Sequence, residues 1–503
     1  MFSKIKSFLF ENRTAKQTIA KNSIWLTISN FGGRFIKAIV IIYAARVLGT
    51  AGWGVLSYAI TLAGFFTFLI DPGVNSIVLR DVPKAEGEKK LNILSTAFVI
   101  KLFLIAIAAI VIIVAGDALS TLPGAKALLP IVILIFAFDT MREFFSSFIR
   151  AKEKMEWEAG IFLLTNLAIM VTGFVFLAYS QTAKAFGWAY VIGTALGALV
   201  AAFILRDELK NMFSHFSRSL IAPILRSAWP FAITGALGIL LTNTDILIIS
   251  WMRSASEVGI YSAAIRIAQV LYLVPIILQY STLPSLSRLA KNDDARFRHV
   301  LEITLSVIFL AAVPMGIGGA ILGEPIMRFV FGDAYAPGGL AFTILMLTLI
   351  FDYPAIIMST AIFAYDRQRN LIISSAIGGV ANVALDLLLI PPFGITGSAV
   401  ATLIAQFMSS AYLWYTMKKI NYFAVVPLLK KIMTAGIVMG IAAVAMSALH
   451  VHVAINILVC IAVYFLVLKS FREPLLSNLA AILRGGAADG QASHEPDAQY
   501  SRG

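Results

Sequence analysis

The sequence has little charge and almost no cysteine. Asp, Glu, Lys and Arg make up 13% of its 503 residues, only about half of their usual share in soluble domains. Its one cysteine, Cys460, excludes an intrachain disulfide and gives no reason to expect a thiol metal site. The phosphate-binding pattern GxxxxGKS/T is absent, and no polar stretch is long enough for a nucleotide-binding domain. The chain is therefore not expected to hydrolyse ATP.

Apolar runs dominate instead, and the mean hydropathy is +0.87. A helix that crosses a bilayer needs about 20 predominantly apolar residues, and runs of this length recur along nearly the whole chain. The sequence therefore predicts an all-α polytopic membrane protein with about 14 transmembrane helices. The predicted spans cover residues 24–45, 55–79, 92–114, 128–149, 160–180, 185–205, 229–251, 261–283, 303–323, 338–363, 371–391, 395–417, 427–448 and 451–468.

The net charge of +13 is spread unevenly over the loops between these spans. Most of the 40 Lys and Arg residues lie in the N-terminal segment, in the loops on its side of the membrane and in the tail. Because basic residues gather in cytoplasmic loops, both termini are expected in the cytoplasm. The positive charge indicates orientation and contact with anionic lipid, and no nucleic-acid partner is expected. The opposite side carries only Arg46, Lys126, Lys184, Arg253 and Arg328.

The chain divides into two related halves. GWGVLSYAI at 52–60 matches EVGIYSAAI at 257–265, an offset of 205 residues, and Asn166 falls opposite Asn382 in a similar alignment. Each half begins and ends on the same side, so the repeats are parallel and related by an axis along the membrane normal. Chance similarity between helices rich in small residues is the alternative. The predicted segments are a basic cytoplasmic stretch 1–21, an N-lobe 22–205, a linker 206–228, a C-lobe 229–417, two further spans in 418–470 and a disordered cytoplasmic tail 471–503.

Two segments carry a family resemblance. NSIWLTISNFGGRFIKAIVIIYAARVLGTAGWGVLSYA at 22–59 resembles the opening of bacterial polysaccharide-biosynthesis flippases of the O-antigen type. IPPFGITGSAVAT at 390–402 resembles a later segment of the same proteins. The chain is thus similar to the multidrug/oligosaccharidyl-lipid/polysaccharide (MOP) exporter superfamily, whose other members include lipid II flippases and multidrug-extrusion proteins.

This resemblance implies a V-shaped fold with two six-helix lobes around a central cavity. It also implies alternating access, in which an undecaprenyl-pyrophosphate-linked oligosaccharide moves from the inner to the outer leaflet of a bacterial inner membrane. Such a protein is a transporter rather than an enzyme, with no catalytic residues and no cofactor beyond a coupling Na⁺ or H⁺. Its partners would be the lipid-linked glycan, the bilayer, and a polysaccharide polymerase with glycosyltransferases. A monomer is expected.

A polar stripe runs along the first span, where Thr27, Asn30, Arg34 and Lys37 follow one another at helical spacing. Arg34 lies about ten residues inside the span, or roughly 15 Å at the rise of an α-helix. A charge at this depth costs about 2.5–3.5 kcal/mol, so it should face a cavity or a partner. Arginine suits phosphate oxygens, which predicts a cationic substrate cavity. The alternative is a structural ion pair with an intramembrane acid such as Asp139 or Asp352.

Further intramembrane charges extend this prediction. Arg266 and Gln269 repeat the pattern in the second half, although Arg266 would also fit a snorkelling role. Lys101 would guide an anionic head group inward from the cytoplasmic face. Asp139 and Arg142 lie three residues apart on one helix, and an internal ion pair is the favoured interpretation, with a gating role as the alternative.

Two acids are predicted gating or cavity residues. Asp352 precedes Pro354, which should kink the span and free backbone carbonyls. Asp71 stands in an Asp-Pro-Gly sequence that interrupts the second span and would act as a hinge.

Asp245, Asn382, Asp386 and Thr402 form the predicted cation-coupling site. They lie roughly 8–14 Å inside the outer ends of their spans, so their oxygens could converge at one level. Hard cations prefer such all-oxygen shells. Some exporters that this chain resembles are sodium-coupled through the C-terminal lobe, which implies a Na⁺ site here. The alternatives are proton carriage by Asp245 and Asp386, and a hydrogen-bond cluster that only holds the lobe together.

Other functions fit the sequence less well. A membrane polymerase would need a long outer loop with catalytic residues, and the longest outer loop spans only about residues 324–337. A multidrug exporter of the same superfamily normally has twelve spans and a more acidic cavity. Lipid II remains an alternative substrate because no residue here identifies the sugar. The last two spans would contact the lipid tail or simply pack against lipid.

Overall fold

The computed structural model describes residues 14–119, 122–210 and 214–471, and all regular secondary structure in these ranges is helical. Most of the predicted basic stretch 1–21 and nearly all of the predicted tail 471–503 lie outside the described residues. The first half of the chain forms α2 (Ala15–Phe65), α3 (Thr67–Ile70), α4 (Val74–Asp81), α5 (Gly87–Leu119), α6 (Leu129–Ala151), α7 (Met155–Tyr179), α8 (Ala183–Ile204) and α9 (Arg206–Leu209). The second half forms α10 (Ile221–Met252), α11 (Ala255–Leu271), α12 (Leu273–Leu289), α13 (Asp294–Ile321), α14 (Gly323–Phe331), α15 (Gly339–Ala364), α16 (Gln368–Ile420), α17 (Val426–Ala448) and α18 (Val453–Ser470).

Ten helical stretches in the described part of the chain are long and apolar enough to cross a membrane. The predicted all-α polytopic membrane fold is thereby confirmed. Predicted spans 371–391 and 395–417 both fall in α16, which is bent at Gly394, where φ is 59°. In the same way α2 contains the first span and part of the second on either side of Gly49, where φ is 66°. The second span is then interrupted at Asp71, whose carboxylate accepts a hydrogen bond from the amide of Gly73.

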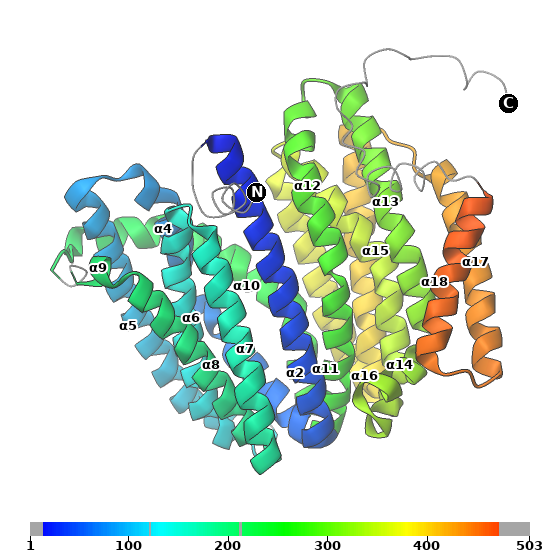
Figure 1. Cartoon of the computed structure of the whole chain (residues 1–503), viewed down its shortest axis with the longest axis horizontal. Helices are drawn as coiled ribbons and strands as arrows, with labels where there is room; N and C mark the ends of the chain where they lie inside the picture. The colour runs from blue at the N-terminus through cyan, green and yellow to red at the C-terminus, as the bar shows by residue number, and fades with distance from the viewer. Residues whose placement is uncertain (1–13, 120–121, 211–213, 472–503) are drawn as a thin grey trace, which may run out of the picture.

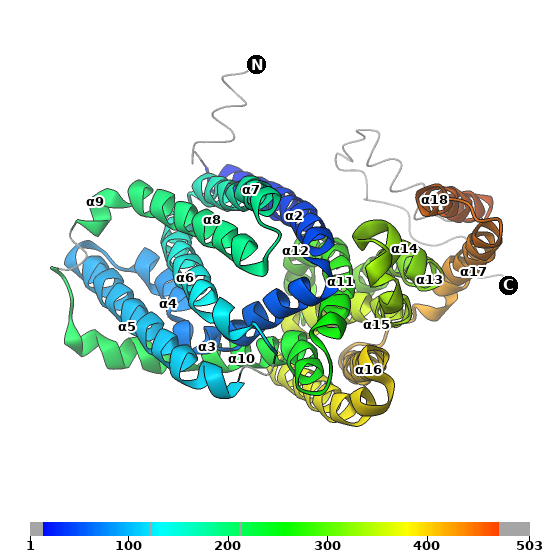
Figure 2. The same ribbon diagram turned by 90° about the horizontal axis from the view of Figure 1, so that it is seen from below.

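The helices form two groups with α2 between them (Figure 1). Helices α4 to α9 lie at one end of the molecule, and α12 to α16 lie in the other part. Helices α17 and α18 stand at the far edge of the second group, as both views show (Figures 1 and 2). Helix α10 joins the groups because it packs against α2 and α4 as well as α16.

The two groups meet most closely where α2 crosses α11. A methyl group added at Gly54 would meet the backbone of Ala255 and Gly259, and one added at Gly259 would meet the backbone of Thr50. Next to this contact the buried Ser262 hydroxyl donates to that of Ser57, at 3.1 Å. Small residues let helix backbones approach in this way. Gly54 with Gly259, and Ser57 with Ser262, are pairs 205 residues apart, so the segments matched in the sequence pack on each other.

Arginine side chains close two helix ends, those of α14 and of the first limb of α16. Arg46 donates to the carbonyl of Val330 at 2.7 Å and also to that of Phe329, in the last turn of α14. Arg253 donates to the carbonyls of Ile390 and Pro391, at 2.7 and 2.6 Å, where the first limb of α16 ends. The last carbonyls of a helix have no partner within it, so these contacts satisfy groups that would otherwise be unpaired.

We predict that Gly54→Ala destabilises the protein, because its methyl group meets backbone that cannot move aside. Overpacking of this kind costs about 1–3 kcal/mol. Thermal unfolding in detergent, followed by the loss of the monodisperse size-exclusion peak, should show a lower midpoint for the variant. Gly160→Ala in α7 is the matched control, because an added methyl group there meets nothing. Equal midpoints for the two variants would contradict the close crossing.

Candidate functional site

The two limbs of α16 form a helical hairpin that brings polar residues together. Ser374 in the first limb and Ser409 in the second are linked through their hydroxyls at 2.7 Å. Nearer the bend, the Asn382 amide donates to the Thr402 hydroxyl at 3.4 Å. The hairpin therefore lays polar side chains from both limbs along one interface, and α10 packs against it.

The centre of this arrangement is the carboxylate of Asp245 on α10. The Tyr261 hydroxyl on α11 donates to Oδ2 of Asp245 at 2.7 Å, and the Thr402 hydroxyl lies 3.0 Å from the same oxygen. Asp386 lies close enough to Asp245 for the two carboxylates to interact electrostatically. The structure thus brings all four predicted cation-coupling residues into one cluster.

Several oxygens of this cluster are buried without a hydrogen-bond partner. They are Asp245 Oδ1, Asn382 Oδ1, both carboxylate oxygens of Asp386 and Ser398 Oγ. No described Lys, Arg or His forms an ion pair with Asp245 or Asp386. Leaving a buried carboxylate uncompensated is costly, so the cluster requires a positive charge, either a bound cation or a proton. Its unpaired oxygens have the chemistry of a hard-cation site, and the residues therefore fit a monovalent metal ion.

The predicted cationic stripe lies on α2, between the two groups of helices. Arg34 is partly exposed and Lys37 is exposed, and no ion pair or hydrogen bond joins either of them to a described residue. Lys37 lies over the Tyr190 ring, 5.9 Å from its centroid. The ion-pair alternative for Arg34 is not found, because Asp139 and Asp352 have other partners. Asn30 falls within α2, but its side chain lies outside the described residues.

Arg266 and Gln269 lie on α11 and contact each other. The guanidinium of Arg266 donates to Gln269 Oε1 at 2.9 Å, while its Nε is buried without a partner. The two predicted cavity residues of the second half therefore form one polar group.

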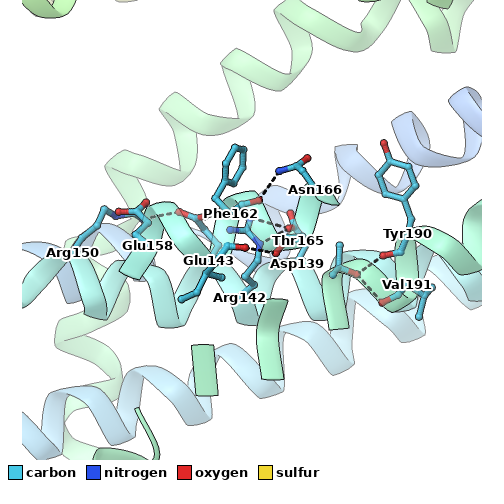
Figure 3. Close-up of polar contacts among 12 residues, drawn as sticks. Asp139, Arg142, Glu143, Arg150, Glu158, Phe162, Thr165, Asn166, Tyr190 and Val191 are labelled. Atoms are coloured by element: carbon cyan, nitrogen blue, oxygen red, sulfur yellow. Dashed lines mark hydrogen bonds and ion pairs between the residues drawn. The ribbon is translucent and has the colours of Figure 1, made fainter. Parts of the chain in front are cut away.

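The intramembrane charges of α6 are engaged with one another (Figure 3). Arg142 donates to Asp139 Oδ1 from Nε and Nη2, at 3.0 and 2.9 Å, so the favoured internal pair is present. Arg150 further along the helix bridges Glu143 and Glu158, with both ion pairs at 2.6 Å. This network ties α6 to α7.

The remaining predicted residues are also paired. Lys101 is fully buried, and its ammonium lies 3.1 Å from the carboxylate of Asp71, which is 23% exposed. Asp352 accepts a hydrogen bond from the Tyr272 hydroxyl. Asp352 also lines a cavity of about 330 Å³ whose wall includes Asn382 and Thr402.

Sequence reasoning missed two members of the oxygen cluster. Ser398 stands four residues before Thr402, which places both on one helical face, and this spacing could have identified it. Tyr261 lies in an apolar helix and gave no signal of its own, because only the packing of α11 against α10 brings its hydroxyl to Asp245.

Comparison with known families decides the relationship. A family model described as "Polysaccharide biosynthesis protein" matches residues 19–290, more than half of the chain. The chain belongs to this family. The predicted resemblance is therefore confirmed. Among the relatives of the chain is a Shigella flexneri protein named "Putative O-antigen transporter", 22% identical over 402 residues that cover 76% of the chain and 94% of the relative.

Solved structures show the same fold. A lipid II flippase, MurJ, in an inward closed conformation matches the structure with a TM-score of 0.74 and 20% identity, over 90% of this chain and 100% of that one. A multidrug resistance MATE transporter of the MOP superfamily, in an inward-facing conformation, matches with a TM-score of 0.62 and 15% identity, over 80% of this chain and 95% of that one. The helices are therefore arranged as in these two solved structures.

We predict that Lys101→Met destabilises the protein because it leaves Asp71 without its cation. Removing one partner of a buried ion pair costs about 3–5 kcal/mol, and the partial exposure of Asp71 places this pair toward the lower end. Thermal unfolding of Lys101→Met, Asp71→Asn and the double variant completes a double-mutant cycle. The double variant should recover much of the loss. A double variant no more stable than Lys101→Met would show that Lys101 acts apart from Asp71.

Proposed function

We propose that this protein is a flippase that moves an undecaprenyl-pyrophosphate-linked oligosaccharide from the inner to the outer leaflet of the bacterial cytoplasmic membrane. The observation that carries the proposal is the pair of uncompensated cations, Arg34 and Lys37, on the helix between the two groups. A charge deep in a span costs about 2.5–3.5 kcal/mol unless it borders water or meets an anion. A pyrophosphate supplies that anion, and the forked guanidinium of arginine matches its oxygens.

The architecture supports alternating access with two lobes of six spans each, plus the pair α17 and α18, to give fourteen crossings. The contact of Gly54 with Gly259 and of Ser57 with Ser262 is what a pseudo-twofold axis along the membrane normal would produce. The basic loops place both termini in the cytoplasm on this proposal. The α2–α11 crossing then lies in the outer half of the membrane and closes that side.

The oxygen cluster supports coupling to a cation gradient. Asp245, Asp386, Asn382, Ser398 and Thr402 would hold Na⁺, or the two carboxylates would share a proton. A bound cation supplies the positive charge that the two adjacent carboxylates require. Because the cluster joins α10, α11 and both limbs of α16, its charge state would bias how these helices pack. A change in packing there is a way to favour one orientation of the cavity over the other.

The first prediction from this proposal concerns the cationic stripe. Arg34→Ala/Lys37→Ala should slow the flipping of a fluorescent undecaprenyl-pyrophosphate-sugar in proteoliposomes by at least about tenfold, since each charge-assisted hydrogen bond contributes about 1.5–3 kcal/mol. Lys184→Ala is the matched control, because Lys184 is exposed and outside the stripe. Unchanged flipping by the double variant would remove the stripe from substrate binding. Absence of flipping by folded wild-type protein would favour a small-molecule exporter of the same fold.

The second prediction concerns coupling. Imposing a Na⁺ or H⁺ gradient across the proteoliposome should accelerate flipping by the wild-type protein. Asp386→Asn keeps the shape of the side chain and removes its charge, so this variant should lose the acceleration while it still folds. Thr402→Val should weaken the acceleration because it removes one oxygen of the cluster. If Asp386→Asn responds to the gradient as the wild type does, the cluster only holds the helices together.

A further inference from the structure

Two adjacent hollows, one basic and one apolar, lie along α15 and α16. They are separate from the cationic stripe on α2 and from the oxygen cluster around Asp245. The first has a volume of about 590 Å³ and is basic, with Lys291, Arg367 and Lys419 in its wall together with Tyr412 and Tyr415. It is formed by the loops before α13 and α16 and by the last turns of α16. These loops lie at the same end of the molecule as the start of α2 (Figure 1).

The second hollow is an apolar groove of about 460 Å³ between α13, α15 and α16. Phe309, Phe351, Met358, Phe407 and Trp414 line it. Phe407 is 52% exposed, so the groove opens to the surroundings of the protein. Tyr415 lines both hollows, which makes the groove and the basic pocket two parts of one surface feature.

The charges of the basic pocket are only partly neutralised. Lys291 pairs with Asp366 at 2.6 Å, and Asp294 accepts a hydrogen bond from Tyr365. The guanidinium of Arg367 forms no ion pair or hydrogen bond within the described part of the chain. Lys419 lies over the Tyr415 ring, 4.3 Å from its centroid, and meets no acid among the described residues. Two cations therefore remain free to bind an anion beside an apolar groove.

We propose that this surface binds one anionic membrane phospholipid, with its phosphate on Arg367 and Lys419 and an acyl chain in the groove. Basic pockets at the cytoplasmic ends of membrane helices are suited to phosphate head groups. The apolar groove can hold a hydrocarbon chain, which a free phosphate ion does not have. The surface belongs to α13, α15 and α16, whereas the cationic stripe belongs to α2 on the other long side of the molecule (Figure 2). The occupant is therefore a lipid of the bilayer rather than the transported glycolipid, and the site is independent of the proposed transport.

Trp414 provides a local probe for the test. The full chain is reconstituted in phosphatidylcholine vesicles. A small fraction of the lipid is brominated on its acyl chains and is either phosphatidylglycerol or phosphatidylcholine. Bromine quenches the fluorescence of nearby tryptophan. The Trp414 signal is the difference between the wild type and Trp414→Phe. Brominated phosphatidylglycerol should quench this signal at about tenfold lower lipid fraction than brominated phosphatidylcholine.

Arg367→Gln/Lys419→Gln should abolish the preference for phosphatidylglycerol while leaving unquenched Trp414 emission unchanged. Arg369→Gln/Lys469→Gln, two exposed basic residues outside the pocket, should keep the preference. If the double variant does not fold, the single variant Arg367→Gln is tested instead. It should reduce the preference for phosphatidylglycerol. Equal quenching by the two lipids would overturn the proposal. So would displacement of the brominated lipid by undecaprenyl pyrophosphate at lower concentration than by phosphatidylglycerol, which would assign the site to substrate.

Discussion

A charged or unpaired polar group inside hydrocarbon must be compensated, and this requirement organises the interior of the molecule. The charges of α6 satisfy it within the protein, because Arg142 holds Asp139 and Arg150 holds two glutamates. Lys101 satisfies it with Asp71. Two of these contacts, Arg150 with Glu158 and Lys101 with Asp71, also join different segments of the chain.

Some groups have no partner of opposite charge among the described residues, and the stripe and the oxygen cluster are two such sets of opposite sign. The stripe on α2 presents cations that no described acid neutralises, whereas the cluster around Asp245 presents carboxylates that no described cation neutralises. Each set would gain its missing partner from solution or from a ligand. A positive surface suits an anionic cargo, and a negative one suits a small cation. Charges inside hydrocarbon need a partner. Charges that are paired within the protein therefore stabilise the structure, and those that are unpaired are candidates for binding a ligand. The placement of the two sets on separate helices would let cargo and ion bind at different points.

Much of this organisation follows from the sequence. Hydropathy predicts the helices, and the depth of Asp245, Asn382, Asp386 and Thr402 predicts that they share a level, since depth depends only on helical rise. The pairing of Asp139 with Arg142 follows from spacing along one helix. Contacts between helices distant in the chain do not follow in this way. Lys101 and Asp71 meet because of how α5 packs beside the break after α3, and Tyr261 reaches Asp245 because α11 packs beside α10. The kinks of α2 and α16 fall between predicted spans, at Gly49 between 24–45 and 55–79 and at Gly394 between 371–391 and 395–417.

The crossing of α2 and α11 has an evolutionary consequence. Gly54 touches Gly259 and Ser57 touches Ser262, so each residue meets its own counterpart in the other half. Two identical half-length chains related by a twofold axis would make the same contacts across a dimer interface. In such a dimer one mutation changes both sides of the contact at once. Only residues that can pack against a copy of themselves would then be retained. Glycine and serine meet that condition. In a chain that joins two such halves, either side could vary separately, and matched pairs such as these would be the imprint of the earlier symmetry.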